Sequence, residues 1–217
     1  ESYVIIYYGA KDGFDRSRRV ALPCYGRSLS IQLADYDKDG WLDIAANSYR
    51  EVGVRIFFGS DKGYSVSRSV NLDAPAVSDI ETADLNADGW LDIVACCYRD
   101  FVNIHNDVGS LIFWGGPKGF KEWNSQWLPG FTPLGPVIAD WDSDGFLDLF
   151  FPFYHGDISR EEQPCYLFWG SANGFSKRGR SYLFNDSGAD GLAADFNKDG
   201  LLDLMVANHT IDGNHNT

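Results

Sequence analysis

The sequence has no apolar run long enough to cross a membrane as a helix, and its first residues do not resemble a signal peptide. No segment shows the hydrophobic periodicity of a helix either. These absences argue against membrane insertion and against a helical bundle. The chain does have 217 residues, enough to bury a core, and 23 glycines among many aromatic residues. That composition favours short strands joined by tight turns.

Cysteine is scarce, and its spacing fits no zinc-binding pattern. Cys96 and Cys97 are neighbours in a predicted strand, so we expect their side chains to point to opposite faces and not to pair with each other. We expect mostly buried free thiols, which leave the redox compartment open. The four cysteines are Cys24, Cys96, Cys97 and Cys165.

Basic residues do not gather into a stripe, which argues against a nucleic-acid partner. The formal net charge is −13, but 14 of the 31 acidic residues fall in four short loops. The other 17 acidic residues nearly balance the 18 lysines and arginines. The negative charge is therefore concentrated in the loops and is not spread over the surface.

Two motifs recur about every 50 to 56 residues, which is the length scale of a propeller blade. One is a nine-position loop with aspartate at positions one, five and nine, aspartate or asparagine at position three, and glycine at position six. The other is an aromatic residue and a glycine, followed after three residues by a second glycine and a second aromatic residue. Each motif occurs four times, and the glycine pairs are Gly9/Gly13, Gly59/Gly63, Gly115/Gly119 and Gly170/Gly174.

The residues between these motifs predict four strands in each repeat. Leu29, Ile31 and Leu33 alternate with polar residues, as in a half-buried strand. An apolar strand follows each aspartate loop, a third runs through 55–58 in this repeat, and a fourth through 65–71. One such meander cannot bury both of its faces, so neighbouring sheets must stack around an axis. The sequence therefore predicts an all-β chain, a β-propeller of four-stranded antiparallel blades.

The repeats divide the chain into one domain of blades. Complete blades are predicted at 27–75, 76–131 and 132–187, with strands three and four of a blade at 1–26 and strands one and two at 188–217. We expect the last strands to pair with the first, either in the same chain or in a partner copy. Three arrangements remain open: a closed four-bladed ring, half of an eight-bladed ring, or part of a seven-bladed propeller.

The aspartate loops are candidate Ca²⁺ sites. Side-chain oxygens at positions one, three, five and nine, with the backbone carbonyl of position seven, form the hard oxygen donor set that Ca²⁺ prefers. We expect up to four ions per chain, with weaker binding where asparagine stands at position three. An EF-hand is excluded, because no glutamate stands at position twelve. The candidate ligands are Asp35, Asp37, Asp39, Trp41 and Asp43; Asp84, Asn86, Asp88, Trp90 and Asp92; Asp140, Asp142, Asp144, Phe146 and Asp148; and Asp195, Asn197, Asp199, Leu201 and Asp203.

These loops, together with the aromatic-glycine motif, resemble FG-GAP repeats, the units of the integrin alpha-subunit propeller and of many bacterial secreted proteins. The resemblance covers essentially the whole chain. It implies a propeller, usually of seven blades, with Ca²⁺ between strands one and two of each blade. It also implies an extracellular or secreted setting, with the cell surface or the periplasm as variants.

Aromatic and basic residues follow the second strand of each repeat, at the end opposite the calcium loops. Tyrosine offers a stacking face and a hydroxyl, and arginine can bind a carboxylate through two hydrogen bonds. We therefore expect a non-catalytic binding or adhesion module for a carbohydrate or an extracellular protein. A purely structural role at the sheet ends explains the same residues equally well. They are Tyr49, Arg50, Tyr98, Arg99, Tyr154, His155 and His209.

The alternative is a polysaccharide lyase or hydrolase, or the propeller domain of one. No Ser/His/Asp or Cys/His order stands out, and most clustered aspartates belong to the calcium loops. The enzyme hypothesis therefore depends on two predicted loops, 100–110 and 156–164. Their candidate residues are His105, Asp107, His155 and Asp157.

Overall fold

The computed structural model describes residues 2–49, 53–99, 107–154, 163–185 and 188–208. These residues form sixteen β-strands and one 3-10 turn. None of the described segments is a helix long and apolar enough to span a membrane. The chain is all-β, as the sequence predicts.

Twelve of the strands described form three four-stranded antiparallel sheets, each an up-and-down meander. The first sheet contains β3 (Ile31–Ala34), β4 (Asp43–Asn47), β5 (Val54–Phe57) and β6 (Ser69–Leu72). The second contains β7 (Val77–Ala83), β8 (Asp92–Cys97), β9 (Ser110–Phe113) and β10 (Ser125–Leu128). The third contains β11 (Val137–Ala139), β12 (Asp148–Phe151), β13 (Gln163–Phe168) and β14 (Arg180–Asn185).

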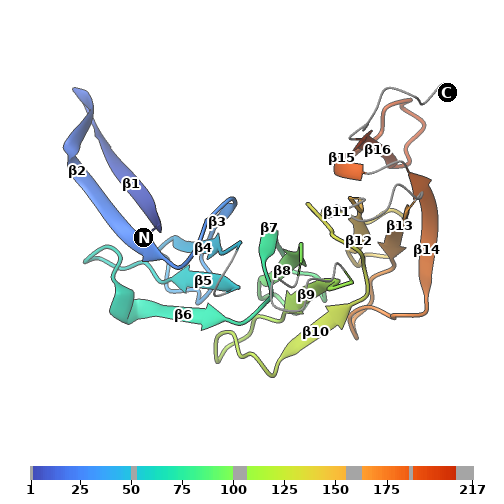
Figure 1. Cartoon of the computed structure of the whole chain (residues 1–217), viewed down its shortest axis with the longest axis horizontal. Helices are drawn as coiled ribbons and strands as arrows, with labels where there is room; N and C mark the ends of the chain where they lie inside the picture. Colours follow the sequence, from blue (N-terminus) through green and yellow to red (C-terminus); the bar gives the residue numbers. More distant parts are fainter. Residues whose placement is uncertain (1, 50–52, 100–106, 155–162, 186–187, 209–217) are drawn as a thin grey trace.

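A two-stranded hairpin stands at each end of this series. The N-terminal hairpin is β1 (Ser2–Ala10) with β2 (Gly13–Cys24), and the C-terminal hairpin is β15 (Gly188–Ala194) with β16 (Asp203–Asn208). Figure 1 shows the five sheets side by side along an open arc, with β3, β7, β11 and β15 toward its concave side. The two hairpins lie at opposite ends of the arc and pair only within themselves. Closure into a four-bladed ring within one chain is therefore not found among the described strands.

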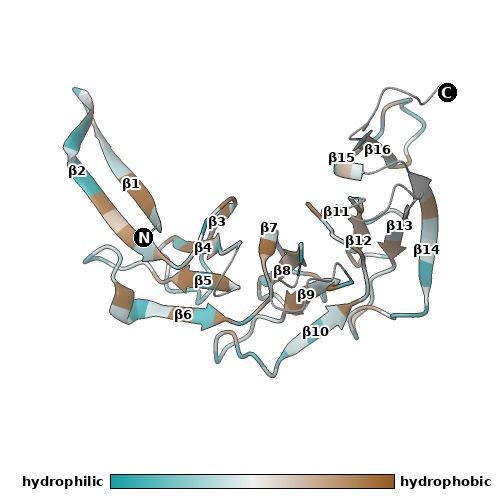
Figure 2. Ribbon diagram, viewed as in Figure 1, coloured by the Kyte–Doolittle hydropathy of each residue, from teal (hydrophilic) through white to brown (hydrophobic). Residues whose placement is uncertain are grey.

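Separate apolar clusters fill the spaces between neighbouring sheets. Ile56 of the first sheet packs with Ile80 of the second, and Ile112 of the second packs with Phe151 of the third. Smaller clusters join the two hairpins to the first and third sheets. Figure 2 shows hydrophobic residues concentrated in middle strands such as β5, β8 and β9. Each complete sheet thus buries both of its faces, which is the packing expected of stacked blades.

The cysteines behave as predicted. All four are buried, and Cys24, Cys96 and Cys97 are free thiols. Cys97 packs in the cluster between the first and second sheets, whereas its neighbour Cys96 packs in the cluster between the second and third. The two side chains therefore occupy opposite faces of β8.

The predicted fourth strand at 65–71 is wrong over its first half. Residues Val66–Arg68 form a 3-10 turn, and the strand β6 starts only at Ser69. The turn is closed by a hydrogen bond from the Arg68 N–H to the Ser65 carbonyl and by one from the Ser69 hydroxyl to the Val66 carbonyl. Local hydrogen bonding by serine overrides the extended pattern here.

In the three complete sheets, the last aspartate of the loop connects the two sequence motifs. In the second sheet, one oxygen of Asp92 accepts the Leu85 N–H at 2.9 Å and the other accepts the Gly115 N–H at 2.8 Å. Asp43 and Asp148 make the same pair of bonds in the first and third sheets. These three side chains are fully buried or nearly so. The carboxylate therefore fastens the loop to the end of the third strand.

The same contact explains why glycine follows the aromatic residue. A Cβ atom on Gly115 would lie 2.1 Å from the Leu91 carbonyl oxygen, and one on Gly59 or Gly170 would be about as close to the corresponding leucine carbonyl. No side chain fits at that distance. The glycine is needed for close approach of two backbone segments, and its N–H then reaches the buried aspartate.

We predict that Gly115→Ala lowers the free energy of unfolding by about 3 kcal/mol, because it forces overlap with a backbone carbonyl and displaces a hydrogen bond to a charged group. Gly116→Ala is the matched control, since a Cβ atom there meets nothing within 4 Å. It should change stability by less than about 0.5 kcal/mol. Denaturant unfolding of both variants in calcium measures this, and equal losses would contradict the assignment.

Candidate functional site: aspartate loops and a tyrosine face

The four aspartate loops share one geometry. In the first, Asp35 accepts backbone N–H bonds from Asp39 at 3.0 Å and from Gly40 at 2.9 Å. Asp39 in turn accepts the Trp41 N–H at 2.9 Å. The corresponding residues of the other three loops make the same bonds. The carboxylates at positions one and five are therefore held in place by the backbone of their own turn.

Two residues in each loop adopt left-handed backbone conformations. The glycine at position six has a φ of +90° at Gly40 and +92° at Gly145. Position four is also left-handed although it carries a side chain, with a φ of +60° at Lys38 and +57° at Ser143. The glycine is evident in the sequence, but position four carries no such signal because lysine, alanine and serine have no special preference for this conformation.

Two loops bring three carboxylates within metal-binding reach. Oxygen atoms of Asp35, Asp37 and Asp39 lie within 4.8 Å of one another, and so do oxygen atoms of Asp140, Asp142 and Asp148. These groups could hold a metal ion. The second cluster includes a ninth-position aspartate, whose oxygens keep a free lone pair after accepting an N–H bond.

The other two loops carry asparagine at position three. The Asn86 amide donates to Asp88 at 3.2 Å, and the Asn197 amide donates to Asp199 at 2.9 Å. A neutral amide thus replaces one carboxylate and donates a hydrogen bond to an oxygen of another. This geometry is consistent with the expected weaker binding in these loops.

Burial raises the pKa values of the ninth-position aspartates in the three complete sheets. It raises the pKa of Asp92 to about 7, with smaller contributions from the carboxylates of Asp88 and Asp84, while the two backbone N–H bonds act in the opposite direction. The pKa values of Asp43 and Asp148 are raised for the same main reason. A bound cation would oppose this effect, since a nearby positive charge favours the ionised form.

Neighbouring loops also contact each other. The ammonium group of Lys38, in the first loop, lies 4.2 Å from the ring centroid of Trp90, a position-seven residue in the second loop. Within the first sheet, Arg68 lies 3.5 Å from Asp39 and donates to the Gly59 carbonyl. The first and second loops therefore contact each other across the boundary between their sheets.

A row of tyrosines lies at the opposite end of the second strands. The rings of Tyr49 and Tyr98 have centroids 5.4 Å apart, and those of Tyr98 and Tyr154 are 6.5 Å apart, all tilted relative to one another. These three residues, here called the tyrosine face, come from three different sheets. The structure thus brings together three of the seven residues predicted to bind a ligand at the ends of the second strands.

The tyrosine face borders a hollow of about 440 Å³. Each sheet contributes one tyrosine and one residue six positions before its aspartate loop. Arg27 completes the lining. The sequence analysis missed Arg27, because its place in the lining depends on which sheets become neighbours. The repeated lining residues are Leu29, Ser78 and Leu134.

The Asn47 side chain supports the wall of this hollow. Its oxygen accepts the N–H groups of Leu29 and Ser30 at 2.7 and 2.9 Å. Its amide donates to the carbonyls of Val77 and Ser78 at 2.6 and 3.0 Å. One buried side chain thus joins the first and second sheets directly beside the tyrosine face.

Of the other predicted binding and catalytic residues, only Arg99 and Asp107 fall within the described part of the chain. Arg99 is half-buried and does not line the hollow. Asp107 is exposed and does not line the hollow beside the tyrosine face. Arg50, His105, His155, Asp157 and His209 lie outside the described residues.

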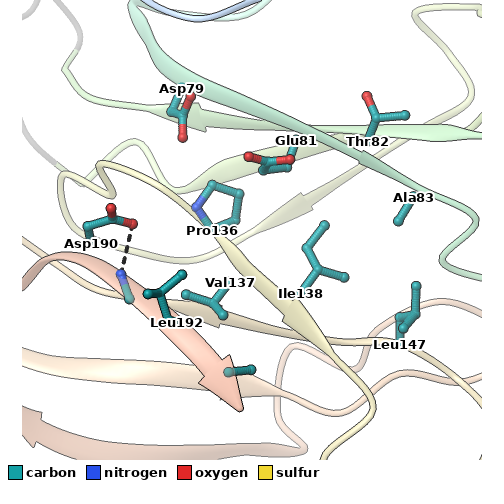
Figure 3. Close-up of a pocket in the computed structure, with 12 residues that line it drawn as sticks. Asp79, Glu81, Thr82, Ala83, Pro136, Val137, Ile138, Leu147, Asp190 and Leu192 are labelled. Atoms are coloured by element: carbon teal, nitrogen blue, oxygen red, sulfur yellow. Dashed lines mark hydrogen bonds between the residues drawn. The ribbon is translucent and has the colours of Figure 1, made fainter. Parts of the chain in front are cut away.

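A second hollow, of about 620 Å³, lies between β7, β11 and β15. Figure 3 shows Asp79 and Glu81 on one side of it and Asp190 on the other. Burial raises the pKa values of Asp79 and Glu81, and repulsion from Asp190 adds to the effect. Gly135 leaves room for this group, because a Cβ atom there would lie 3.0 Å from Asp79 Oδ2.

We predict that Asp79→Asn stabilises the protein at pH 7. The folded-state pKa of Asp79 is raised, so the native protein gains stability as the pH falls through that pKa toward the ordinary value of 3.8. The asparagine variant lacks this dependence, so its advantage over the parent should shrink between pH 7 and pH 4. Unfolding free energies of both proteins across that range test the sign; an advantage that stays constant would contradict it.

The chain was also compared with known proteins. No protein-family model matches it, and no curated protein matches it. The site is therefore interpreted from its own residues and their geometry.

Proposed function

We propose that this chain is a calcium-binding β-propeller segment of the FG-GAP type that acts as a non-catalytic, extracellular binding module. The observation that carries the proposal is the fourfold aspartate loop. One geometry recurs in all four loops, and in the three complete sheets its last carboxylate is fastened to the sheet. A turn-forming preference explains one such loop but not four in register.

Calcium is the ion that the donor set favours. Carboxylate oxygens, with an amide oxygen in two loops and a backbone carbonyl at position seven, are the hard ligands that Ca²⁺ prefers, and a bidentate carboxylate or water would complete its coordination shell. Without a cation, two carboxylates about 4 Å apart repel each other by about 4 kcal/mol at an effective dielectric constant near 20. The clustered carboxylates of the first and third loops thus favour occupation.

The bound calcium would stabilise the fold. Each loop joins the first and second strands of its sheet, and in the complete sheets its ninth aspartate reaches the end of the third strand. An ion held by the same carboxylates would therefore fix three of the four strands of a sheet. A ligand that binds only the native state adds to stability as its occupancy rises.

We predict that chelation lowers the melting temperature, and that the Asp144→Asn variant loses about one bound Ca²⁺ per chain. A site filled to 100 times its dissociation constant contributes about 2.7 kcal/mol, which corresponds to about 5 to 10 °C for a chain of this size. Asp61→Asn is the control, because Asp61 lies in an exposed turn outside the loops. Isothermal titration and thermal unfolding measure both effects. Equal calcium loss in the two variants would refute the loop assignment.

The tyrosine face is the proposed ligand site. Three tilted tyrosine rings with an exposed arginine beside them suit a carbohydrate, because the rings can stack on sugar faces and the guanidinium group can bind a carboxylate. An acidic segment of an extracellular protein offers the same carboxylate. Its position at the far end of the second strands keeps this site apart from the calcium loops.

We predict that Tyr98→Ala weakens binding of a carbohydrate ligand at least tenfold, since the central ring contacts both neighbours and truncation of a central aromatic residue costs about 2 kcal/mol or more. Tyr182→Ala, which removes an exposed tyrosine from β14, should leave binding unchanged. Uronate-containing and neutral oligosaccharides on a glycan array select the ligand, and calorimetry gives the affinities. Release of reducing or unsaturated sugar ends would favour the enzyme alternative.

A further inference from the structure

The basic residues, although dispersed along the sequence, favour one position in the repeat. Eleven of the 18 lysines and arginines lie in four segments of eleven residues, each of which starts at the first glycine of the aromatic-glycine motif. These segments, here called the basic turns, contain only four acidic residues, so together they carry a charge of +7. Nine of the eleven basic side chains are exposed. The basic turns are 9–19, 59–69, 115–125 and 170–180.

The basic turns lie at the same end of the sheets as the aspartate loops. In the first sheet, the Tyr64 hydroxyl donates to the Leu42 carbonyl at 2.7 Å, and Arg68 lies 3.5 Å from Asp39. In the second and third sheets, the first glycine of the turn lies directly against a leucine carbonyl of the loop. The four aspartate loops and the four basic turns are together called the calcium end.

Contacts between sheets join the parts of the calcium end. The Tyr36 ring in the first aspartate loop packs edge-on against the Phe120 ring in the second sheet's basic turn, with centroids 5.5 Å apart. Gln126, just after that turn, donates to the Phe175 carbonyl at 2.6 Å and accepts the Phe175 N–H at 3.2 Å in the next basic turn. The calcium ends of the three complete sheets are therefore held side by side, and their charges act together.

Calcium would reverse the net charge of this end. The four aspartate loops contain 14 aspartates and two lysines, a charge of −12, so the calcium end carries −5 without ions. Filling the two loops with clustered carboxylates would bring it to −1, and filling all four would bring it to +3. The rest of the chain carries −8 in either case. The loaded protein would thus have one positive end on an otherwise negative molecule.

We infer that the calcium-loaded end adsorbs to an anionic lipid surface without inserting into it, and that loss of calcium releases the protein. The inference rests on the proposed calcium binding and assigns a partner other than the ligand of the tyrosine face. Lysine and arginine side chains are attracted to an anionic membrane when they come within a Debye length of it, about 10 Å at 0.1 M ionic strength. The exposed basic turns meet that condition at a flat surface, whereas the unloaded end, with its net negative charge, is repelled.

A lipid surface fits the shape of this end. Its basic charges are spread over neighbouring sheets, and neither of the two hollows described above is lined by a residue of a basic turn. Trp123, two residues after Lys121 in the second sheet's basic turn, is 83% exposed. Tryptophan favours the boundary between lipid headgroups and acyl chains, where its ring is buried and its N–H stays hydrated. An exposed tryptophan among lysines is therefore suited to shallow contact with a membrane.

Sedimentation with lipid vesicles tests the inference. In calcium, the full chain should sediment with vesicles made of equal parts phosphatidylserine and phosphatidylcholine, but not with vesicles of phosphatidylcholine alone and not after chelation. Added salt should weaken the binding. Calorimetry of calcium uptake in the same buffer separates the two proposals. Calcium uptake without vesicle binding would overturn this inference alone, whereas a lack of calcium uptake would overturn the proposed calcium sites as well.

Two matched variants test which end makes the contact. Glu122→Lys lies in a basic turn, whereas Asp73→Lys lies just after β6, at the opposite end of the first sheet. Both residues are exposed, and each change raises the net charge by two. Glu122→Lys should strengthen vesicle binding in calcium about tenfold, and Asp73→Lys should change it by less than about twofold. Equal gains would show that binding follows net charge alone and would overturn the assignment to the calcium end.

The opposite change provides a further test. A variant with both Lys121→Glu and Arg178→Glu replaces two exposed basic side chains and should lose vesicle binding while its calcium uptake and melting temperature stay close to those of the parent. Vesicle binding that persists in this folded, calcium-loaded variant would contradict the inference. Dextran sulfate, a soluble polyanion, is the comparison for the partner: if it binds in calcium and the vesicles do not, the partner is an acidic polymer and the lipid assignment is wrong.

Discussion

The buried aspartate at the end of the loop in each complete sheet makes the interaction on which the rest of the structure depends. Its two oxygens hold the turn on one side and the aromatic-glycine segment on the other, so two motifs separated in sequence become one unit. Removing a carboxylate from water is costly unless its oxygens are hydrogen-bonded, and the two backbone amides meet that need. The three complete sheets repeat this arrangement, and it sets the register of the strands around it.

The sequence predicts the parts of the fold that depend on pattern. Alternation and turn glycines indicate the strands, and in-register aspartates indicate the loops, because both follow from local residue preferences. The turn at Val66–Arg68 escaped prediction because serine hydroxyls compete locally with the strand. The role of Gly115 is visible only in three dimensions, because it depends on a carbonyl 24 residues earlier in the chain.

The candidate sites also differ in how much of each can be predicted from the sequence. The aspartate loops were evident because all of their donors lie within nine residues. The residues of the tyrosine face were predicted to share one face at the ends of the second strands, and the structure shows that inter-sheet packing brings Tyr49, Tyr98 and Tyr154 into one row. Arg27 and the acidic hollow around Asp79 were missed, since each depends on which strands become neighbours on the concave side. The residues of a site that lies within one repeat can be predicted from the sequence. Contacts between repeats can be predicted only when the packing of neighbouring sheets is known.

The separate apolar clusters between neighbouring sheets make the chain a nearly one-dimensional array. Each sheet gains its stability from its own strands and from the one or two sheets beside it, so the effect of a local defect should fade with distance along the arc. All three complete sheets have a neighbour on each side, but only the second lies between two complete sheets, so it has the strongest support among the described sheets. Opening of the native state should therefore progress one sheet at a time and reach the second sheet last.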